Sequence, residues 1–282
     1  MSIETALILA QGFGTRFLPI TKSIQKEMLP LLDRPVIDYV IEDCLKAGVK
    51  RVIVAVKPGE VQIRNYYTPQ ADFRAYLRQK GALAKLELLD VVEQRGQAVS
   101  FIEVDPLKQY GTAVPVLAAR ELLQSEPAFL VITGDELLYQ PDGQSAVQGL
   151  IDLWQLTHAP VITGLSVDPN LIDRYGIIDT VEKDGILYLK SLVEKPAIGS
   201  VSSHLANLSK YILTANILPL IAHQEADSRS GELYLTDSIS LLAEISPVAV
   251  YSPEQAVYLD CGNPESWLKA NQYLAQQQAG PL

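Results

Sequence analysis

The sequence is poor in cysteine and has no long apolar run. Its two cysteines, Cys44 and Cys261, are far apart, whereas zinc sites and redox dithiols use close pairs. No stretch reaches the roughly 18 apolar residues of a membrane span, and the N-terminus has no basic segment followed by an apolar core. We therefore expect a reduced, cytoplasmic protein that carries no export signal.

Positive charge is also scarce. The 23 Lys and Arg residues against 33 Asp and Glu residues give a net charge of −10. The excess of negative charge repels the phosphates of nucleic acids and anionic membranes, so neither is expected as a partner. One segment departs from this pattern, because Arg16, Lys22 and Lys26 gather ahead of Glu27.

Nothing in the chain divides it into separate domains. Its 282 residues are 48% hydrophobic, which is enough for a substantial core, and no low-complexity linker interrupts them. We expect one continuous α/β domain over residues 1–282.

The N-terminal half alternates strand-like and helical patterns. Pro35 suits a first helical turn and Gly48 suits a helix end. The expected strands are 6–10, 51–56, 98–104 and 129–133, and the expected helices are 35–47, 58–66, 71–79, 82–94 and 112–123. The strand–helix–strand order predicts parallel pairing, which brings strand ends together as a ligand site.

The texture changes from residue 159. Lys183, Asp184 and Gly185 are typical of a hairpin turn between two strands. The expected strands are 161–167, 176–181, 186–193, 205–213, 248–251 and 257–259, and the expected helices are 215–222, 237–244 and 263–277. No internal repeat is evident.

The segment from Gly12 to Leu31 is the most informative in the chain. It follows a buried strand, and its glycines let backbone N–H groups approach a phosphate. Phe17 stands where a Walker loop needs the glycine that begins its Gly-Lys-Ser/Thr ending, and where a dinucleotide fingerprint needs its third glycine, so both of those motifs are excluded. On the glycines alone, a solvated turn with scattered basic residues remains open.

The whole segment resembles the signature of the sugar-1-phosphate nucleotidylyltransferases, most closely the bacterial UTP-glucose-1-phosphate uridylyltransferases. The matching positions are Gly12, Gly14, Thr15, Arg16, Leu18, Pro19, Thr21, Lys22, Lys26, Glu27, Met28, Leu29 and Pro30. The resemblance implies a Rossmann-like fold with a mixed, mainly parallel central sheet flanked by helices. Residues about 1–158 would bind the nucleotide, and about 159–282 would bind the sugar phosphate and end in a closing helix.

The resemblance also implies a reaction. Glucose 1-phosphate would attack the α-phosphorus of UTP, giving UDP-glucose and pyrophosphate with the help of Mg²⁺. Such transfers depend on positioning and on positive charge around the phosphates. Relatives of this kind commonly self-associate, so a dimer or tetramer is expected.

Five charged residues take catalytic or metal-binding roles by this resemblance, and one of the catalytic residues, Lys195, also belongs to the sugar-phosphate motif described below. Arg16 would grip the β- and γ-phosphates, Lys26 would neutralise the α-phosphate, and Asp135 and Asp260 would hold Mg²⁺. Taken singly, the cations could be ordinary surface residues, Asp135 could cap a turn, and Asp260 could cap the last helix.

The sugar phosphate would be held by a Glu-Lys-Pro motif. Glu194 would accept hydrogen bonds from sugar hydroxyls and Lys195 would pair with the phosphate, with Gly176 behind the ring and Glu232 in a later acidic loop. A strand end and a hairpin bend are the alternatives for these residues. The residues expected to bind the nucleotide are Ala10, Gln11, Gly12, Gly14, Thr15, Glu103, Gly111 and Asp135.

The chain departs from the family's pattern around the base. Gln11 replaces an alanine or glycine, and the family's base-reading glutamine is missing, leaving Glu103, Asp105 and Gln109 nearby. A carboxylate repels uracil O4 but can accept the N3–H. Smaller departures are Gln25, which replaces a proline, and His204, which replaces an asparagine. The use of dTTP, another nucleotide or another sugar phosphate stays open, as does a catalytically weak regulatory homologue that binds a nucleotide sugar.

Overall fold

The computed structural model describes residues 2–279, built around a nine-stranded sheet in the order β5-β4-β1-β6-β11-β8-β12-β10-β9. β1 (Thr5–Ala10) lies between β4 (Arg51–Val56) and β6 (Phe129–Thr133), and β5 (Val99–Glu103) continues beyond β4, all in parallel. Every residue of β1 is buried, as expected for a parallel strand covered on both faces.

The other half of the sheet is largely antiparallel. β11 (Leu205–Leu213) pairs antiparallel with β6 and with β8 (Val161–Ser166). The remaining strands are β12 (Ala249–Tyr251), β10 (Ile186–Glu194) and β9 (Gly176–Lys183). The sheet is therefore mixed, as predicted, with parallel pairing confined to the four N-terminal strands and to β8 with β12.

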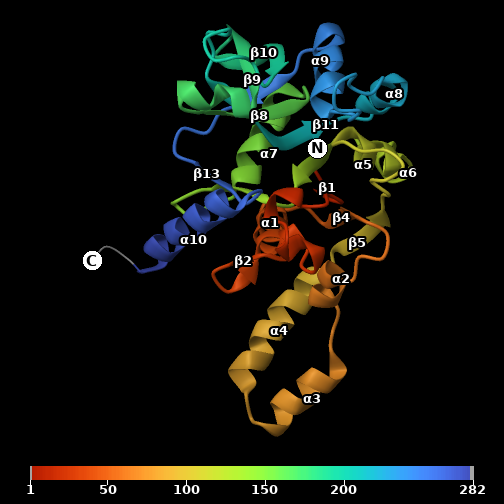
Figure 1. Cartoon of the computed structure of the whole chain (residues 1–282), viewed down its shortest axis with the longest axis vertical. Helices are drawn as coiled ribbons and strands as arrows, with labels where there is room; N and C mark the ends of the chain where they lie inside the picture. Colours follow the sequence, from red (N-terminus) through yellow and green to blue (C-terminus); the bar gives the residue numbers. More distant parts are fainter. Residues whose placement is uncertain (1, 280–282) are drawn as a thin grey trace.

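Helices cover both faces of the sheet (Figure 1). One apolar cluster joins the sheet to α1 (Val36–Lys46) and α7 (Ala146–Thr157). The other joins it to α5 (Ala113–Ala118), α8 (Ile217–His223) and α9 (Leu235–Ile245). This layering buries the sheet and leaves the ends of its strands to form a site.

Two helices extend away from the sheet. α3 (Ala71–Gln79) and α4 (Leu83–Gly96) pack together as an arm below α2 (Gln62–Tyr67) in Figure 1. Arg95 anchors the base of the arm to α1, because it donates to Asp38 Oδ2 at 2.8 Å and pairs with Glu42. Asp38 is fully buried and also accepts from the Tyr67 hydroxyl.

A two-stranded sheet carries the end of the chain back to the centre. β7 (Glu136–Tyr139) pairs antiparallel with β13 (Val257–Asp260), and α10 (Pro264–Ala279) follows directly. The small elements before α1 are η1 (Thr15–Phe17), η2 (Ile20–Lys22), η3 (Lys26–Met28), β2 (Pro30–Leu31) and β3 (Arg34–Pro35). Trp267 on α10 donates its indole N–H to Pro30 O at 2.9 Å, so α10 closes onto the glycine-rich loop region.

The elements differ from expectation in a few places. The expected helix 112–123 is divided into α5 and α6 (Arg120–Leu123), because the backbone leaves helical geometry at Ala119. α2 begins at Gln62 rather than at residue 58, after Pro58 and Gly59 form a turn. α7, β7 and the 3-10 helix η4 (Pro169–Arg174) were not predicted.

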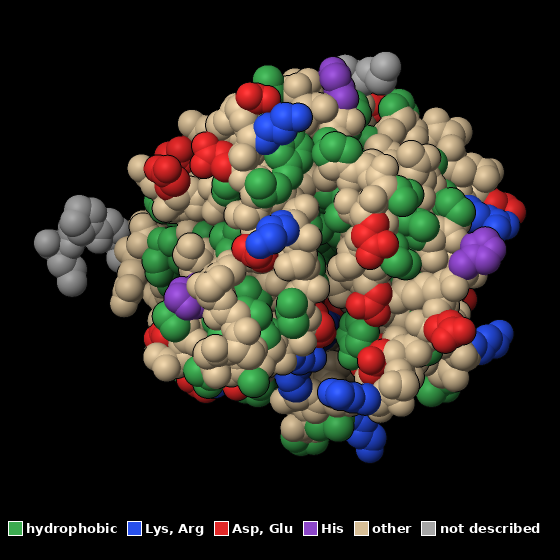
Figure 2. Space-filling view, turned by 90° about the horizontal axis from the view of Figure 1, so that it is seen from above, with side chains coloured by type: hydrophobic (Ala, Val, Ile, Leu, Met, Phe, Trp, Pro, Cys, Tyr) green, Lys and Arg blue, Asp and Glu red, His purple; other side chains and the backbone are tan. Residues whose placement is uncertain are grey.

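The surface has no single dominant character on the face that Figure 2 shows. Hydrophobic side chains are scattered among polar ones, and acidic and basic side chains are interspersed. Within residues 2–279, no helix is long and apolar enough to cross a membrane.

Candidate active site

The glycine-rich loop leaves β1 and turns at once toward the end of β6. Gly14 has φ +65°, and a Cβ there would lie 2.9 Å from Thr21 Cγ2, so a larger residue would be strained and crowded. Thr21 donates its hydroxyl to Gly14 O at 2.8 Å, which closes the loop on itself. A Cβ on Gly12 would lie 3.4 Å from Lys26 Cε, so Gly12 leaves room for the lysine.

Lys26 is held between two carboxylates. Its Nζ lies 2.7 Å from Asp135 Oδ2 and 3.6 Å from Glu27 Oε1. Burial opposes its charge, but Asp135 and Glu27 outweigh burial and raise the pKa of Lys26 above its usual value. Asp135 is buried as well, yet Lys26 lowers its pKa, so both groups are charged and paired in the ligand-free protein.

Two aspartates converge from distant parts of the chain. The ladder between β7 and β13 pairs Glu136 with Asp260, and Cys261 N donates to Asp135 O at 3.0 Å. A Cβ on Gly262 would lie 3.0 Å from Asp260 Oδ1, 3.3 Å from Asp135 Oδ2 and 3.5 Å from Arg16 Nη1. Both carboxylates and one guanidinium therefore surround a single point.

This donor set suits a hard divalent cation. Mg²⁺ in phosphate-handling sites commonly uses one or two carboxylates and takes its other oxygens from substrate and water. Among residues 2–279 no group of three or more His, Cys, Asp or Glu side chains is arranged to hold a metal. The two aspartates fit an ion that shares the substrate's phosphates.

Two adjoining cavities meet at these residues. The larger, of about 400 Å³, is lined by Arg16, Asp135, Asp260, Gly176 and Glu194, among others. The smaller, of about 100 Å³, is lined by Gln11, Gly12, Lys26, Gly111 and Glu232, among others. Leu9, Thr112 and Asp135 line both cavities.

A backbone clasp closes the smaller cavity. Leu233 N donates to Tyr110 O at 2.9 Å, and Ala113 N donates to Leu233 O at 3.0 Å. Gly111 lies between these bonds with φ +131°, and a Cβ there would lie 2.2 Å from Leu233 O. Only glycine fits at position 111, and the clasp places Glu232 in the lining of the smaller cavity together with Gly12.

Of the residues around the predicted base site, Gln11 lines the smaller cavity, whereas Gln25 and Glu103 do not. Gln11 is 8% exposed, and its Nε2 lies 3.5 Å from Gly111 O. Gln25 is also buried and donates to Ala10 O at 2.6 Å, which braces the end of β1. Glu103 instead pairs with Arg64 at 3.4 Å and is not among the residues lining either cavity. Its role in nucleotide binding stays a prediction.

Three other predicted residues lie behind or beside the cavities. Ala10 is buried at the end of β1, and Gly14 and Thr15 lie in the loop without lining either cavity. Their contribution would be to shape the loop that presents Gly12 and Arg16.

The expected sugar-phosphate residues gather where β9 and β10 pair. Glu194 pairs with Gly176 in the strand register, and a Cβ on Gly176 would lie 3.0 Å from Glu194 Oε2. Burial raises the pKa of Glu194. Lys195 has φ +44°, an uncommon conformation for a lysine, and its N–H donates to Tyr175 O at 3.0 Å. Its side chain is 56% exposed and lies 3.7 Å from Glu194, outside the cavity lining.

Several residues that line the cavities were given no role in the sequence analysis. Glu27 is fully buried against the smaller cavity, and burial raises its pKa to about 7. Arg174, Asn207, Tyr211, Thr236 and Tyr258 line the larger cavity. The signature that contains Glu27 pointed to it, whereas Asn207 and Tyr211 lie within an ordinary apolar strand pattern that gives no local signal.

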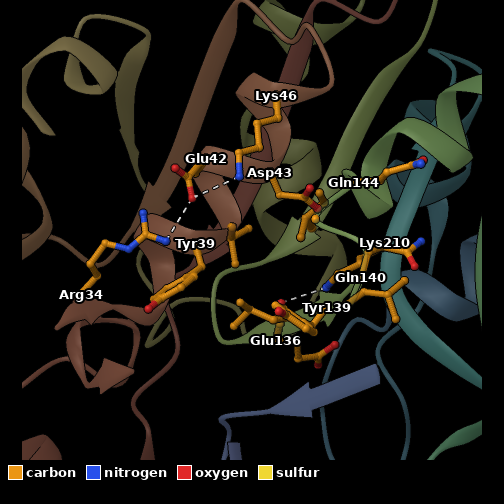
Figure 3. A pocket seen from close by; sticks show the side chains of 15 residues that line it. Arg34, Tyr39, Glu42, Asp43, Lys46, Glu136, Tyr139, Gln140, Gln144 and Lys210 are labelled. Carbon is orange, nitrogen blue, oxygen red and sulfur yellow. Dashed lines mark hydrogen bonds and ion pairs between the residues drawn. The ribbon is translucent and has the colours of Figure 1, made fainter. Parts of the chain in front are cut away.

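A third cavity, of about 180 Å³, lies beside α1 and β7 (Figure 3). It is lined by Glu42, Asp43 and Lys46 from α1 and by the buried Lys210 from β11. Lys210 donates to Glu136 O at 2.9 Å, while burial lowers its pKa. Arg16, Asp135 and Asp260 do not line this cavity, so it is separate from the predicted catalytic residues. Lys210 instead holds the start of β7 in place through its bond to Glu136 O.

The fold and the two adjoining cavities define a class of protein. A Rossmann-like sheet presents a glycine-rich, cation-bearing loop opposite two carboxylates, with a polar pocket lined by Gly176 and Glu194 alongside, and this arrangement is typical of a nucleotidyltransferase. The chain belongs to the nucleotidyl transferase family, whose model matches residues 5–277.

Named relatives fall within one branch of this family. The chain is 34% identical over 268 residues to UTP–glucose-1-phosphate uridylyltransferase 2 of Staphylococcus saprophyticus, covering 95% of this chain and 90% of the relative. It is 32% identical over 257 residues to the Bacillus subtilis enzyme of the same kind, covering 91% and 86%.

Solved structures agree with the sequence relatives. A UTP-bound UGPase from Acinetobacter baumannii matches with a TM-score of 0.83 and 30% identity, covering 96% of this chain and 93% of that one. A UDP-glucose pyrophosphorylase complexed with UDP-glucose matches with a TM-score of 0.83 and 25% identity, covering 97% and 98%. The predicted fold class and family are confirmed.

Proposed function

We propose that the protein transfers a uridylyl group from UTP to glucose 1-phosphate, giving UDP-glucose and pyrophosphate. The observation that carries the proposal is the convergence of Arg16, Asp135 and Asp260 around one point, in a cavity that Glu194 and Gly176 also line. The similar curated proteins are uridylyltransferases of this kind, which supports the choice of substrates.

The reaction is a single in-line displacement. A phosphate oxygen of glucose 1-phosphate bonds to the α-phosphorus as the bond from that phosphorus to the bridging oxygen breaks. Pyrophosphate leaves with the bridging oxygen, and no covalent enzyme intermediate forms. Catalysis then depends on alignment and on stabilising the charge that builds on the phosphates.

The cations divide this work by position. Arg16, at the loop end of the larger cavity, grips the β- and γ-phosphates. Lys26 neutralises the α-phosphate. In the ligand-free protein Lys26 is paired with Asp135, so ligand binding exchanges a carboxylate partner for a phosphate partner.

We propose Mg²⁺ as the metal ion, since enzymes of this family generally use a divalent metal. Asp135 and Asp260 would hold it, and it would supply positive charge beside the reacting phosphates. Asp260 is already oriented, because its Oδ1 accepts from Gly262 N at 2.7 Å and its Oδ2 from Asn263 Nδ2 at 3.1 Å.

The two halves of the chain share the substrates. Residues about 1–158 hold chiefly the nucleotide, through Ala10, Gln11, Gly12, Gly14, Thr15, Glu103 and Gly111. Residues about 159–282 hold the sugar phosphate, through Gly176, Glu194, Lys195 and Glu232. Glu232 also lines the smaller cavity beside Gly111, so the C-terminal part contributes to both substrates.

Pyrophosphate release tests this proposal directly. Purified protein with Mg²⁺ and glucose 1-phosphate should release pyrophosphate with UTP, and each other nucleoside triphosphate is assayed in parallel. A preference for dTTP would make the protein a thymidylyltransferase of the same class, an alternative that rests on the missing base-reading glutamine in residues 101–113. If pyrophosphate is released with none of the triphosphates and sugar phosphates tested, the regulatory homologue is supported instead.

We further propose that the protein is cytoplasmic and that it self-associates into a dimer or tetramer. Size-exclusion chromatography with light scattering, on the full chain at micromolar concentration, should give a mass of two or four subunits. A mass of one subunit would contradict self-association without affecting the proposed reaction.

A further inference from the structure

Buried polar atoms without partners concentrate in the two ligand cavities. In the described part of the chain, eight buried side-chain oxygen or nitrogen atoms have no hydrogen-bond partner. Six of them belong to residues that line the two cavities: Glu27, Thr133, Glu136, Asn207 and Thr236. An unpaired buried polar group destabilises the folded protein, so such a group is usually completed by a ligand or water.

Asn207 is the most informative of these residues, because one atom of its amide has a defined partner and the other has none. Its Nδ2 donates to the Tyr211 hydroxyl at 2.8 Å, while its Oδ1 is buried and has no partner within residues 2–279. Both side chains line the larger cavity. Asn207 therefore offers the cavity an acceptor that nothing in the described chain uses.

Tyr211 supplies a matching donor. Its hydroxyl accepts from Asn207 and has the Ser209 side chain as a second neighbour that lowers its pKa as a donor does, and within residues 2–279 it donates to no side chain or backbone oxygen. Burial raises the pKa of Tyr211, so the hydroxyl keeps its proton. A tyrosine hydroxyl that is already accepting can still donate this proton to a ligand oxygen.

An irregularity in β11 brings the two residues together. The register of β11 against β8 shifts between Leu208 and Tyr211, so the strand departs from regular pairing between the two side chains. Such bulges re-aim side chains toward a site. The acceptor and the donor thus meet in one place.

This place lies in the sugar-binding part of the cavity. A Cβ on Gly176 would lie 3.8 Å from Asn207 Cβ and 3.0 Å from Glu194 Oε2. Asn207 therefore stands close to Gly176, as Glu194 does. The carboxylates of Glu136 and Glu194 line the same cavity, which disfavours an anionic group on the ring.

We propose that Asn207 and Tyr211 together bind one hydroxyl group of the sugar ring and select for it. Asn207 Oδ1 accepts a hydrogen bond from that sugar hydroxyl, and the Tyr211 hydroxyl donates a hydrogen bond to the oxygen of the same sugar hydroxyl. A sugar without the hydroxyl leaves both buried groups unpaired, which is the situation in which enzymes discriminate most strongly. The inference rests on the proposed function and adds a specificity determinant to it.

The test compares glucose 1-phosphate with its 2-, 3-, 4- and 6-deoxy analogues, using UTP and Mg²⁺. The wild-type protein should use one of these analogues with a kcat/KM lower by about 100-fold or more. Asn207→Leu should lose most of that discrimination at the same ring position, and at that position only. KM for UTP should stay unchanged in the variant.

Two further variants keep the test decisive. Tyr211→Phe removes a single hydroxyl, so it is expected to fold even if Asn207→Leu does not, and it should relax discrimination at the same ring position. Asn65→Leu makes the same chemical change on the exposed surface of α2, away from both cavities, and should leave every ratio unchanged.

Each failure is recognisable. If both cavity variants keep the wild-type ratios for all four analogues, or relax them at different ring positions, the shared hydroxyl is overturned while the proposed function stands. If the wild-type protein does not use glucose 1-phosphate at all, the proposed function falls and takes this inference with it.

Discussion

Asp135 is paired with Lys26 in the ligand-free protein and would bind a metal ion in the proposed reaction. Lys26 Nζ occupies one of its oxygens at 2.7 Å. The same carboxylate lies near the point shared with Asp260 and Arg16. A residue in this position is charged and oriented before any substrate arrives, which is the arrangement that electrostatic catalysis requires.

Replacing Asp135 by alanine should therefore lower kcat by about 100-fold or more, the scale on which transition-state electrostatic contacts act. Steady-state rates of pyrophosphate release measure the effect, and circular dichroism verifies folding. Asp135→Asn keeps the shape and loses the charge, and should fall nearly as far. Near-normal turnover in either variant would exclude Asp135 as a metal ligand.

Lys195 should affect binding of the sugar phosphate more than turnover of bound substrate. It is 56% exposed and its backbone is fixed by the hydrogen bond to Tyr175. Lys195→Ala should raise KM for glucose 1-phosphate by about tenfold, the equivalent of a charged hydrogen bond of about 1.4 kcal/mol. Lys190→Ala, an exposed cation of β10 paired with Asp179, is the control. An unchanged KM in Lys195→Ala would contradict the assignment.

Glu27 should make the ligand-free protein less stable as the pH rises. Burial raises its pKa from 4.5 to about 7, so the folded protein holds this proton more tightly than the unfolded chain. Its contribution to stability is complete below about pH 4.5, is lost between about pH 4.5 and 7, and then stays constant; the total is about 3 kcal/mol. Above pH 7 the folded protein contains a buried charge beside Lys26.

Urea unfolding of the wild type and of Glu27→Gln at pH 5 and pH 8 measures this. Glutamine resembles the protonated acid, so the variant should gain in unfolding free energy relative to the wild type on going from pH 5 to pH 8. A difference between the two proteins that is the same at both values would show that Glu27 does not titrate in this range.

At the scale of elements, the nucleotide site depends on the clasp between the loop at Gly111 and the loop at Leu233. Gly111→Ala would place a methyl group 2.2 Å from Leu233 O, so one of the loops must move. We expect a loss of about 2 kcal/mol or more in unfolding free energy and a higher KM for UTP.

Gly143→Ala is a matched control for the clasp. Gly143 also has a positive φ, +77°, but nothing lies within 4 Å of its Cβ position. It should lose only the backbone term of about 1 kcal/mol and keep the KM for UTP. Equal losses in the two variants would mean that the contact with Leu233 is unimportant.

The elements also mark what can be predicted from sequence. β1, α1, β4, α3 and β6 were predicted within a residue or two, because apolar periodicity and a proline or glycine at the ends describe them locally. α7 carries the same signals, with Ser145 capping Gln148 N and an apolar stripe that includes Val147 and Trp154, and could have been predicted.

β7 is a different case, since it has only four residues and its partner β13 comes more than a hundred residues later. The pairing that brings Asp260 to Asp135 is therefore set by tertiary structure. The resemblance to the family predicted both aspartates as metal ligands, but the contacts of Asn207 and Tyr211 depend on an irregular strand that no local pattern describes.

For the whole molecule, substrate binding and folding should be coupled, because the site is assembled from segments near residues 12–26, 111, 135, 176–211, 232 and 260. A ligand that binds only the folded chain stabilises it by about 2.7 kcal/mol when present at about 100 times its Kd. For a chain of this size that amounts to a rise of roughly 5–10 °C in Tm.

UTP with Mg²⁺ should therefore raise Tm in differential scanning fluorimetry, and removal of the metal with EDTA should cancel most of the rise. The effect should be much smaller in Asp135→Asn, which cannot hold the ion with the same charge. If UTP stabilised the wild type equally with and without Mg²⁺, the nucleotide would be held by Arg16, Lys26 and the loop backbone alone. The two aspartates would then act only in later steps of the reaction.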